Sequence, residues 1–161
     1  QHPRVDFSVS ATTRPPRDGE EDGRDYRFLS QEEFDALVAE DAFLEHATVH
    51  GRSYGTLRAD VEKSLEAGHH VVLEIDVQGA DQVRESGLPQ VSLFIQPPSL
   101  EVLRERLLAR GTEDPEEMDR RLEVVEEEMA QSDQYDHVVV NDDLDAMIAE
   151  VEDILGLRQK A

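Results

Sequence analysis

The 161-residue sequence contains no cysteine, which excludes a disulfide framework and any metal site built from thiolates. It has no apolar run approaching the roughly 20 residues that a membrane-spanning helix needs. The first residues do not show the basic-then-apolar pattern of a secretory signal peptide. From these absences we expect a cytoplasmic protein, and the length is sufficient for one hydrophobic core.

Lysine is also scarce, because all basic residues except Lys63 and Lys160 are arginines. The 16 basic residues face 38 acidic ones, which gives a formal net charge of −22. This charge repels nucleic acids and anionic lipid surfaces, so we expect neither as a partner. Adaptation to high salt and a coding bias that replaces lysine by arginine both explain this composition. The sequence does not indicate an oligomeric state.

The six histidines do not show the spacing of metal ligands. His69 and His70 are adjacent, so in a strand their side chains point to opposite sides. We interpret all six as structural or surface residues. The sequence also offers no convincing Ser-His-Asp arrangement, so it does not favour a hydrolase of that type.

The first third of the chain reads as a small mixed sheet with one helix, over residues 8–56. Ser30 and Glu33 form a capping-box pair, which predicts the start of a helix. Gly68 is a typical helix stop. The predicted elements are strands and turns over 8–28, a helix over about 31–40, an extended segment over 42–50 and a helix over about 57–67.

After His70 the pattern changes to alternating strands and helices. The near-continuous apolar run Val71–Ile75 predicts a strand that is buried on both faces. The alternation predicts a parallel sheet with right-handed crossovers, and hence an α/β fold. Asp114 and Pro115 are a predicted N-cap and first helical residue. The further predicted elements are strands over 91–95 and 138–140 and helices over about 80–85, 100–110, 115–131 and 143–156.

A cluster of arginines in the segment Ser8–Tyr26 stands out from the acidic chain. Arg14 and Arg17 flank a Pro-Pro pair, which makes a stiff elbow bordered by two guanidinium groups. This arrangement suits the capture of a phosphate dianion. From chemistry alone, a surface turn with solvated charges is an equally good interpretation.

Seven blocks of the sequence resemble guanylate kinases, in the same order as in that family. The first is the arginine segment, which resembles the nucleoside-monophosphate (NMP) binding segment of the family. The blocks are Phe7–Arg17 with Gly19-Glu20 and Gly23–Tyr26, Phe43–Ala47, Ser53–Thr56, Glu74–Gly79, Ile95–Ser99, Arg106–Thr112 and Val140–Asp143.

The resemblance implies a parallel-sheet core of the P-loop-kinase type, a small mixed α/β NMP-binding subdomain and a helical lid. Residues 1–161 would form a single domain, divided into a GMP-binding region over 8–59, a core over 60–99 and 122–161, and a lid over 100–121. The phosphate-loop motif G-x-x-x-x-G-K-[ST] of the family does not occur in these residues. We therefore expect the family's first strand, loop and first helix to be missing, apolar surface to be exposed, and kinase activity to be weak or absent.

By resemblance, the GMP site is formed by residues of the first half of the chain. Glu45 would read guanine, because a carboxylate can accept both the N1–H and the N2 amino hydrogens of that base. Without the family resemblance, we would interpret Glu45 as a solvated carboxylate on a strand. Tyr26 and Tyr54 would be interpreted as half-buried packing residues. The implied GMP-site residues are Ser10, Arg14, Arg17, Glu20, Tyr26, Glu45, Tyr54 and Thr56.

By the same resemblance, Asp76 faces the nucleotide and its Mg²⁺, and Arg106, Arg110 and Arg121 stabilise the transferred phosphoryl group. Asn141 would contact the adenine of ATP. Many relatives have Asp where this chain has Glu74, which leaves the role of Glu74 open. From the residues alone, Asp76 could simply cap the next helix. From the residues alone, the arginines could instead pair with Glu101, Glu105 and Glu117 on a solvated face, which is the interpretation we prefer for Arg104 and Arg120.

The sequence is therefore compatible with two functions. The first is an enzyme that transfers the γ-phosphoryl group of ATP to GMP, with Mg²⁺. The second is a non-catalytic guanylate-kinase-like module that binds GMP or a phosphorylated peptide. The lid arginines and the segment Asp76–Gly79 favour the enzyme, since binding modules of this type tend to have lost both.

Overall fold

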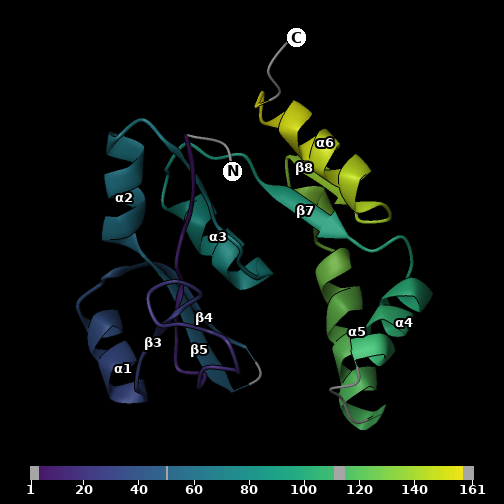
Figure 1. Ribbon diagram of the computed structural model, residues 1–161, viewed down its shortest axis with the longest axis horizontal. Coiled ribbons are helices and arrows are strands. Elements are labelled where there is room, and N and C mark those ends of the chain that lie inside the picture. Colours follow the sequence, from purple (N-terminus) through teal and green to yellow (C-terminus); the bar gives the residue numbers. More distant parts are fainter. Residues whose placement is uncertain (1–3, 50, 111–114, 158–161) are drawn as a thin grey trace. The chain divides into compact units, whose positions relative to one another are not determined.

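The computed structural model describes the backbone of residues 4–49, 51–110 and 115–157, and the side chains of the same residues except 110–121. The chain divides into two compact units, Gln1–Pro89 (unit 1) and Gln90–Ala161 (unit 2). Both units mix strands with helices, and Figure 1 shows the elements of each. The α/β class that the sequence predicts is confirmed. Among the described residues, no helix is long and apolar enough to cross a membrane.

A four-stranded mixed sheet forms the first part of unit 1. Its strands lie in the order β3-β2-β5-β4, so β4 is an edge strand. The pairs β2–β5 and β4–β5 are antiparallel, and β2–β3 is parallel. The strands are β2 (Ala11–Thr12), β3 (Arg27–Phe28), β4 (Phe43–Val49) and β5 (Arg52–Leu57). This is the small mixed sheet that the sequence predicts.

Helix α1 (Gln31–Ala39) packs on this sheet and begins where the capping box predicts. The Ser30 hydroxyl accepts a hydrogen bond from the Glu33 N–H, and the Glu33 carboxylate accepts one from the Ser30 N–H. Phe34 of the helix stacks on Phe43 of β4, with ring centroids 4.6 Å apart. Both rings are buried with Ala11, which makes one hydrophobic core of unit 1.

A second sheet of unit 1 pairs β1 (Val5–Phe7) with β6 (His70–Val72) in parallel. Helices α2 (Arg58–Glu66) and α3 (Val77–Glu85) belong to the same part of the unit. A second core cluster joins β4 to the two helices through three buried side chains. These are Leu44, Val61 and Val83.

The prediction that Val71–Ile75 is a strand buried on both faces is wrong. The strand ends at Val72, Val71 and Val72 are only half-buried, and Glu74 is exposed. Burial on both faces needs neighbouring strands on each side and helices above and below. Among the described residues, β6 has β1 as its one strand neighbour, so the apolar run continues as irregular chain.

Unit 2 contains a parallel pair of strands, β7 (Leu93–Gln96) and β8 (His137–Val140). Each boundary falls within a few residues of the prediction. Asp114, the predicted N-cap, lies outside the described residues. The helices of the unit are α4 (Leu100–Arg110), α5 (Pro115–Met129), a 3₁₀ turn (Ser132–Gln134) and α6 (Leu144–Ile154).

Several large apolar side chains of the two parallel strand pairs are exposed. Phe7 of β1 is 70% exposed, and Ile95 of β7 is 51% exposed. Val138 and Val140 of β8 are also exposed. Apolar surface of this kind agrees with the expectation from the sequence.

Candidate functional site

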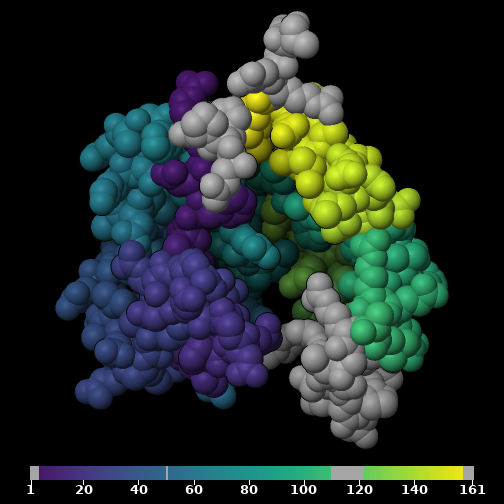
Figure 2. Space-filling view, in the orientation of Figure 1, coloured from purple at the N-terminus to yellow at the C-terminus, as the bar shows by residue number. Residues whose placement is uncertain are grey.

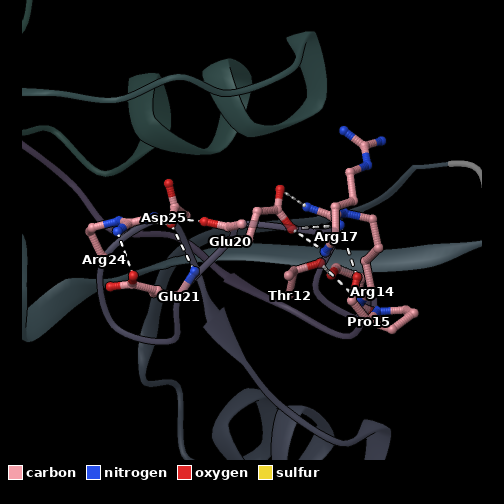
Figure 3. A network of polar contacts seen from close by, with 10 residues as sticks. Thr12, Arg14, Pro15, Arg17, Glu20, Glu21, Arg24 and Asp25 are labelled. Atoms are coloured by element: carbon pink, nitrogen blue, oxygen red, sulfur yellow. Dashed lines mark hydrogen bonds and ion pairs between the residues drawn. The ribbon is translucent and has the colours of Figure 1, made fainter.

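The arginine segment is closed by a two-point ion pair between Arg14 and Glu20 (Figure 3). The Arg14 Nη1 and Nη2 atoms lie 3.0 and 2.8 Å from the two carboxylate oxygens. Glu20 also accepts a hydrogen bond from the Arg17 N–H at 2.7 Å. The Arg14 guanidinium and this N–H hold the pKa of Glu20 below its usual value, and the Glu20 carboxylate raises the pKa of Arg14. Glu20 therefore fixes the turn and the orientation of Arg14.

Two tyrosines surround the Arg14 guanidinium. Its Cζ atom lies 5.3 Å from the ring centroid of Tyr26, a cation–π distance. Tyr26 and Tyr54 meet edge-on with centroids 6.2 Å apart. Tyr54 also helps to raise the pKa of Arg14 through a hydrogen bond to it. Both tyrosines are half-buried, so they pack as the sequence alone suggests and still present phenols beside Arg14.

The three arginines of the segment differ in their surroundings. Arg17 is exposed, and within the described residues no hydrogen bond or ion pair engages its guanidinium, which extends away from the turn in Figure 3. Arg24 pairs with Glu21 and Asp25. In the space-filling view this early part of the chain, in purple, lies at the surface of unit 1 (Figure 2). Arg14 is thus prearranged, Arg17 is available to an anion, and Arg24 is engaged by carboxylates.

A set of hydroxyl contacts that no sequence pattern indicates joins the arginine segment to β5. The Thr12 hydroxyl donates to the Ser53 carbonyl at 2.9 Å and accepts from the Arg14 N–H at 3.1 Å. The Ser53 N–H donates to the Thr13 hydroxyl at 2.9 Å. These bonds fix the backbone just before Arg14 to Ser53, which is the residue next to Tyr54.

Glu45 of β4 is buried, with 4% of the residue exposed, so its interpretation without the family, as a solvated strand carboxylate, is wrong. The pairing of β4 with β5 shifts register between Phe43 and Glu45, which is a β-bulge at Leu44. A bulge changes which face of the sheet the following side chains occupy, and here Phe43, Leu44 and Glu45 are all buried. The carboxylate is therefore held inside unit 1.

Burial raises the pKa of the Glu45 carboxyl, and the negative charge of Asp76 raises it further. The adjacent Thr56 opposes this shift through its hydroxyl and its backbone. Thr56 is fully buried, and its hydroxyl has no well-formed hydrogen bond within the described part of the chain. A buried carboxyl beside a hydroxyl with spare hydrogen-bonding capacity is suited to a polar ligand.

Asp76 caps helix α3, as the residue pattern alone suggests. Its Oδ1 atom accepts a hydrogen bond from the Gly79 N–H at 2.8 Å. Gly79 in turn lies against Glu45, since a Cβ atom added there would be 2.5 Å from the Glu45 Oε2 atom. The start of α3 and the Glu45 carboxylate are therefore neighbours, a packing relation that the sequence does not reveal.

Unit 2 contains a pocket of about 230 Å³ between β7, α4 and the end of β8. Arg106 lines it, and its Nη1 atom donates to the Asn141 carbonyl at 2.8 Å. Within the described residues no ion pair joins Arg106 to Glu101 or Glu105, so the alternative interpretation, a pairing with these carboxylates, is wrong for Arg106. The side chains of Arg110, Glu117 and Arg121 lie outside the described residues. The pocket is lined by Ile95, Gln96, Pro97, Leu103, Arg106, Leu107 and Asn141.

Comparison with known proteins identifies the family. A family model described as guanylate kinase matches residues 1–157. The chain belongs to the guanylate kinase family. A guanylate kinase of Gloeobacter violaceus is 54% identical over 155 residues, which cover 96% of this chain and 76% of the relative. One of Cutibacterium acnes is 48% identical over 157 residues, covering 97% and 79%. A crystal structure of guanylate kinase from Anaplasma phagocytophilum matches with a TM-score of 0.82 and 36% identity, covering 98% of this chain and 78% of that one.

In this member of the guanylate kinase family, most of the residues expected to bind GMP fall into two groups in unit 1. One group is joined by direct contacts around Arg14, and the other surrounds Glu45. Ser10 is half-buried, and its carbonyl accepts a hydrogen bond from Arg27 at 2.9 Å. The first group is Arg14, Arg17, Glu20, Tyr26 and Tyr54, and the second is Glu45 and Thr56. Asp76, which is expected to face the nucleotide and its Mg²⁺ and not to bind GMP, lies close enough to Glu45 to raise its pKa.

Proposed function

We propose that the protein transfers the γ-phosphoryl group of ATP to GMP, giving ADP and GDP. The observation that carries the proposal is the buried Glu45 carboxyl beside Thr56, in a chain of the guanylate kinase family. The proposed regions are the GMP-binding part over 8–59, the core over 60–99 and 122–161, and the lid over 100–121.

Recognition of guanine rests on Glu45. An ionised carboxylate accepts hydrogen bonds from guanine N1–H and from its 2-amino group at the same time. Adenine has an acceptor at N1 and no 2-amino group, so it would leave a buried carboxylate without partners. A site of this kind can discriminate between bases by about 10⁴-fold. Thr56 and Ser10 would add hydroxyl contacts to the same base.

The phosphate of GMP would lie between Arg14, Arg17 and the two phenols, Tyr26 and Tyr54. Guanidinium groups bind several phosphate oxygens at once, and the phenols donate without adding charge. Glu20 has a different role from the other residues. It accepts hydrogen bonds from both Nη atoms of Arg14 and therefore holds the guanidinium group in place. This supports a preformed anion site on a chain that is otherwise strongly acidic.

The nucleotide that donates the phosphoryl group would contact residues of unit 2. Asn141 and Arg106 line one pocket, which supports binding of the adenine there. Arg106, Arg110 and Arg121 would stabilise the charge that spreads over the phosphoryl oxygens during transfer.

Magnesium is expected to accompany ATP. The described residues contain no group of three or more His, Cys, Asp or Glu side chains that could hold a metal ion. Mg²⁺ is commonly held by one or two carboxylates together with substrate phosphates and waters, so the single carboxylate of Asp76 fits this mode. The ion would supply positive charge that stabilises the phosphoryl group during transfer. Asp76 would help to orient it.

A coupled assay of GMP-dependent ADP formation tests the proposal. It is run on the 161-residue chain and on the same chain preceded by a segment that carries the family's phosphate loop. We expect turnover of GMP but not AMP in the extended protein, and little or none in the 161 residues alone. Equal rates with GMP and AMP, or no turnover in either protein, would contradict the proposed reaction, and GMP binding without turnover would favour the non-catalytic module.

A further inference from the structure

The outer edge of β4 is covered at one residue by a side chain of helix α3. Because β4 is an edge strand, every second residue has an N–H and a C=O that face away from β5 and pair with no other strand of the described chain. The His46 N–H donates to the Gln82 Oε1 atom at 3.0 Å, and the Gln82 Nε2 atom donates to the His46 carbonyl at 2.7 Å. The side-chain amide of Gln82 thus pairs with the strand as another peptide group would. Figure 1 shows α3 beside β4.

The residue before His46 is Glu45, and α3 contacts it as well. The Cα of Gly79 lies so close to the Glu45 carboxylate that a single added methyl group would overlap it. Gly79 and Gln82 are three residues apart and therefore lie on one face of the helix. Through these two residues, α3 borders Glu45 at its carboxylate and holds the backbone that follows it.

We propose that Gln82 is a positioning residue for guanine recognition, because its two hydrogen bonds to His46 fix β4 against α3 and so fix the Glu45 carboxylate. This inference rests on the proposed function of Glu45. The β-bulge at Leu44 makes such a restraint useful, since a bulge interrupts the regular pairing of β4 with β5 just before Glu45. On the other edge of the strand, the Gln82 amide fixes the position of the backbone at His46.

Two fixed acceptors are needed for guanine, and small displacements of the carboxylate would misalign both of them. Without the Gln82 amide, water can satisfy the exposed His46 groups, so the main effect falls on position and less on stability. AMP gains nothing from a correctly placed carboxylate, so its binding reports on the phosphate contacts alone. The ratio of the two affinities therefore isolates the positioning role.

The test is calorimetric titration of the 161-residue chain with GMP and AMP, using Gln82→Met and Gln90→Met. Methionine keeps the length of the side chain and removes the amide. Gln90 is an exposed glutamine beyond α3, so it provides the same chemical change away from β4. We expect Gln82→Met to weaken GMP binding by about tenfold, the order that one lost hydrogen bond costs, and to change AMP binding less than about twofold. Gln90→Met should match the wild type with both nucleotides.

If Gln82→Met does not fold, Gln82→Glu takes its place, since it has the same shape and cannot donate to the His46 carbonyl at neutral pH. A wild-type ratio of GMP to AMP affinity in either folded variant would overturn the inference and leave the proposed function intact. An equal loss for both nucleotides would also overturn it, because that pattern indicates a purely structural role. A wild-type chain without any preference for GMP would instead contradict the proposed function, and the inference with it.

Discussion

Glu45 differs from the other described carboxyl groups with shifted pKa values, because its pKa is raised while theirs are lowered. Glu20 shows the opposite case, since it is surrounded by donors. Surface carboxylates are stabilised by hydrogen bonds. Glu45 instead loses hydration, and among the described residues no cation contributes to the shift of its pKa. A residue that destabilises the empty protein and suits a ligand is a good candidate for a binding site.

The raised pKa of Glu45 predicts a pH-dependent effect of Glu45→Gln on stability. Folding favours the protonated form of Glu45, so burial costs free energy above the folded-state pKa and none below the ordinary value near 4.5. The neutral glutamine should therefore raise the melting temperature at pH 8, and the gain should shrink as the pH falls toward 4. Thermal unfolding of both proteins across this range measures it. A gain that is constant with pH, or a loss at pH 8, would contradict this interpretation.

Arg14 predicts a selective loss of phosphate affinity in the variant Arg14→Lys. Lysine cannot engage both Glu20 oxygens, and it lacks the planar group that lies over Tyr26. We expect GMP to bind about tenfold more weakly and guanosine, which has no phosphate, to bind as before. Arg24→Lys is the matched control, because Arg24 is an exposed arginine of the same segment. Equal losses for GMP and guanosine in calorimetry would argue against the phosphate role.

At the scale of elements, the position of α3 against β4 can be tested through Gly79→Ala. Alanine in place of a helical glycine normally stabilises a protein by roughly 0.5–1 kcal/mol. Here the new Cβ would lie 2.5 Å from the Glu45 Oε2 atom and 3.2 Å from the Ile75 Cβ atom. We therefore expect Gly79→Ala to be destabilising, and less so in the background of Glu45→Ala, where the closer contact is removed. Urea unfolding of the four proteins forms a double-mutant cycle, and additive effects would contradict the proposed contact.

Local elements could be predicted from the sequence because their signals are local. Helix α1 starts at the capping box of Ser30 and Glu33, whose partners lie three residues apart. The bulge at Leu44 and the contact of Gln82 with His46 could not be predicted, because they join residues far apart in the chain. The same holds for the burial of Glu45: a charged residue in a strand usually faces water, and only tertiary packing reverses that.

The candidate site was predicted through resemblance more than through chemistry. The residues alone suggested an anion-binding elbow at Arg14 and Arg17, and the structure adds that Glu20 holds Arg14. Residue chemistry did not indicate Glu45 as a base reader. The strand Val71–Ile75 was predicted too long, because an apolar run reports the burial of a segment and not the number of strands that pair with it.

At the scale of the whole molecule, the net charge of −22 predicts a dependence of stability on salt. Like charges repel across the surface, and the distance over which they act falls from about 10 Å at 0.1 M salt to about 3 Å at 1 M. We expect the melting temperature to rise by several degrees between 0.05 and 1 M KCl, with a non-ionic solute of equal osmolality as the control. An unchanged melting temperature would leave a coding bias as the explanation of the arginine-rich, lysine-poor composition.

The central claim is that GMP binds with its base against Glu45 and its phosphate beside Arg14 and Arg17. The most direct measurement is calorimetry at low ionic strength on the folded chain, with GMP and AMP, for the wild type and for the charge reversal Glu45→Lys. We expect the wild type to prefer GMP strongly and Glu45→Lys to lose that preference while it remains folded by circular dichroism. Equal affinity of the wild type for the two nucleotides, or a preference for GMP that survives the charge reversal, would contradict the claim.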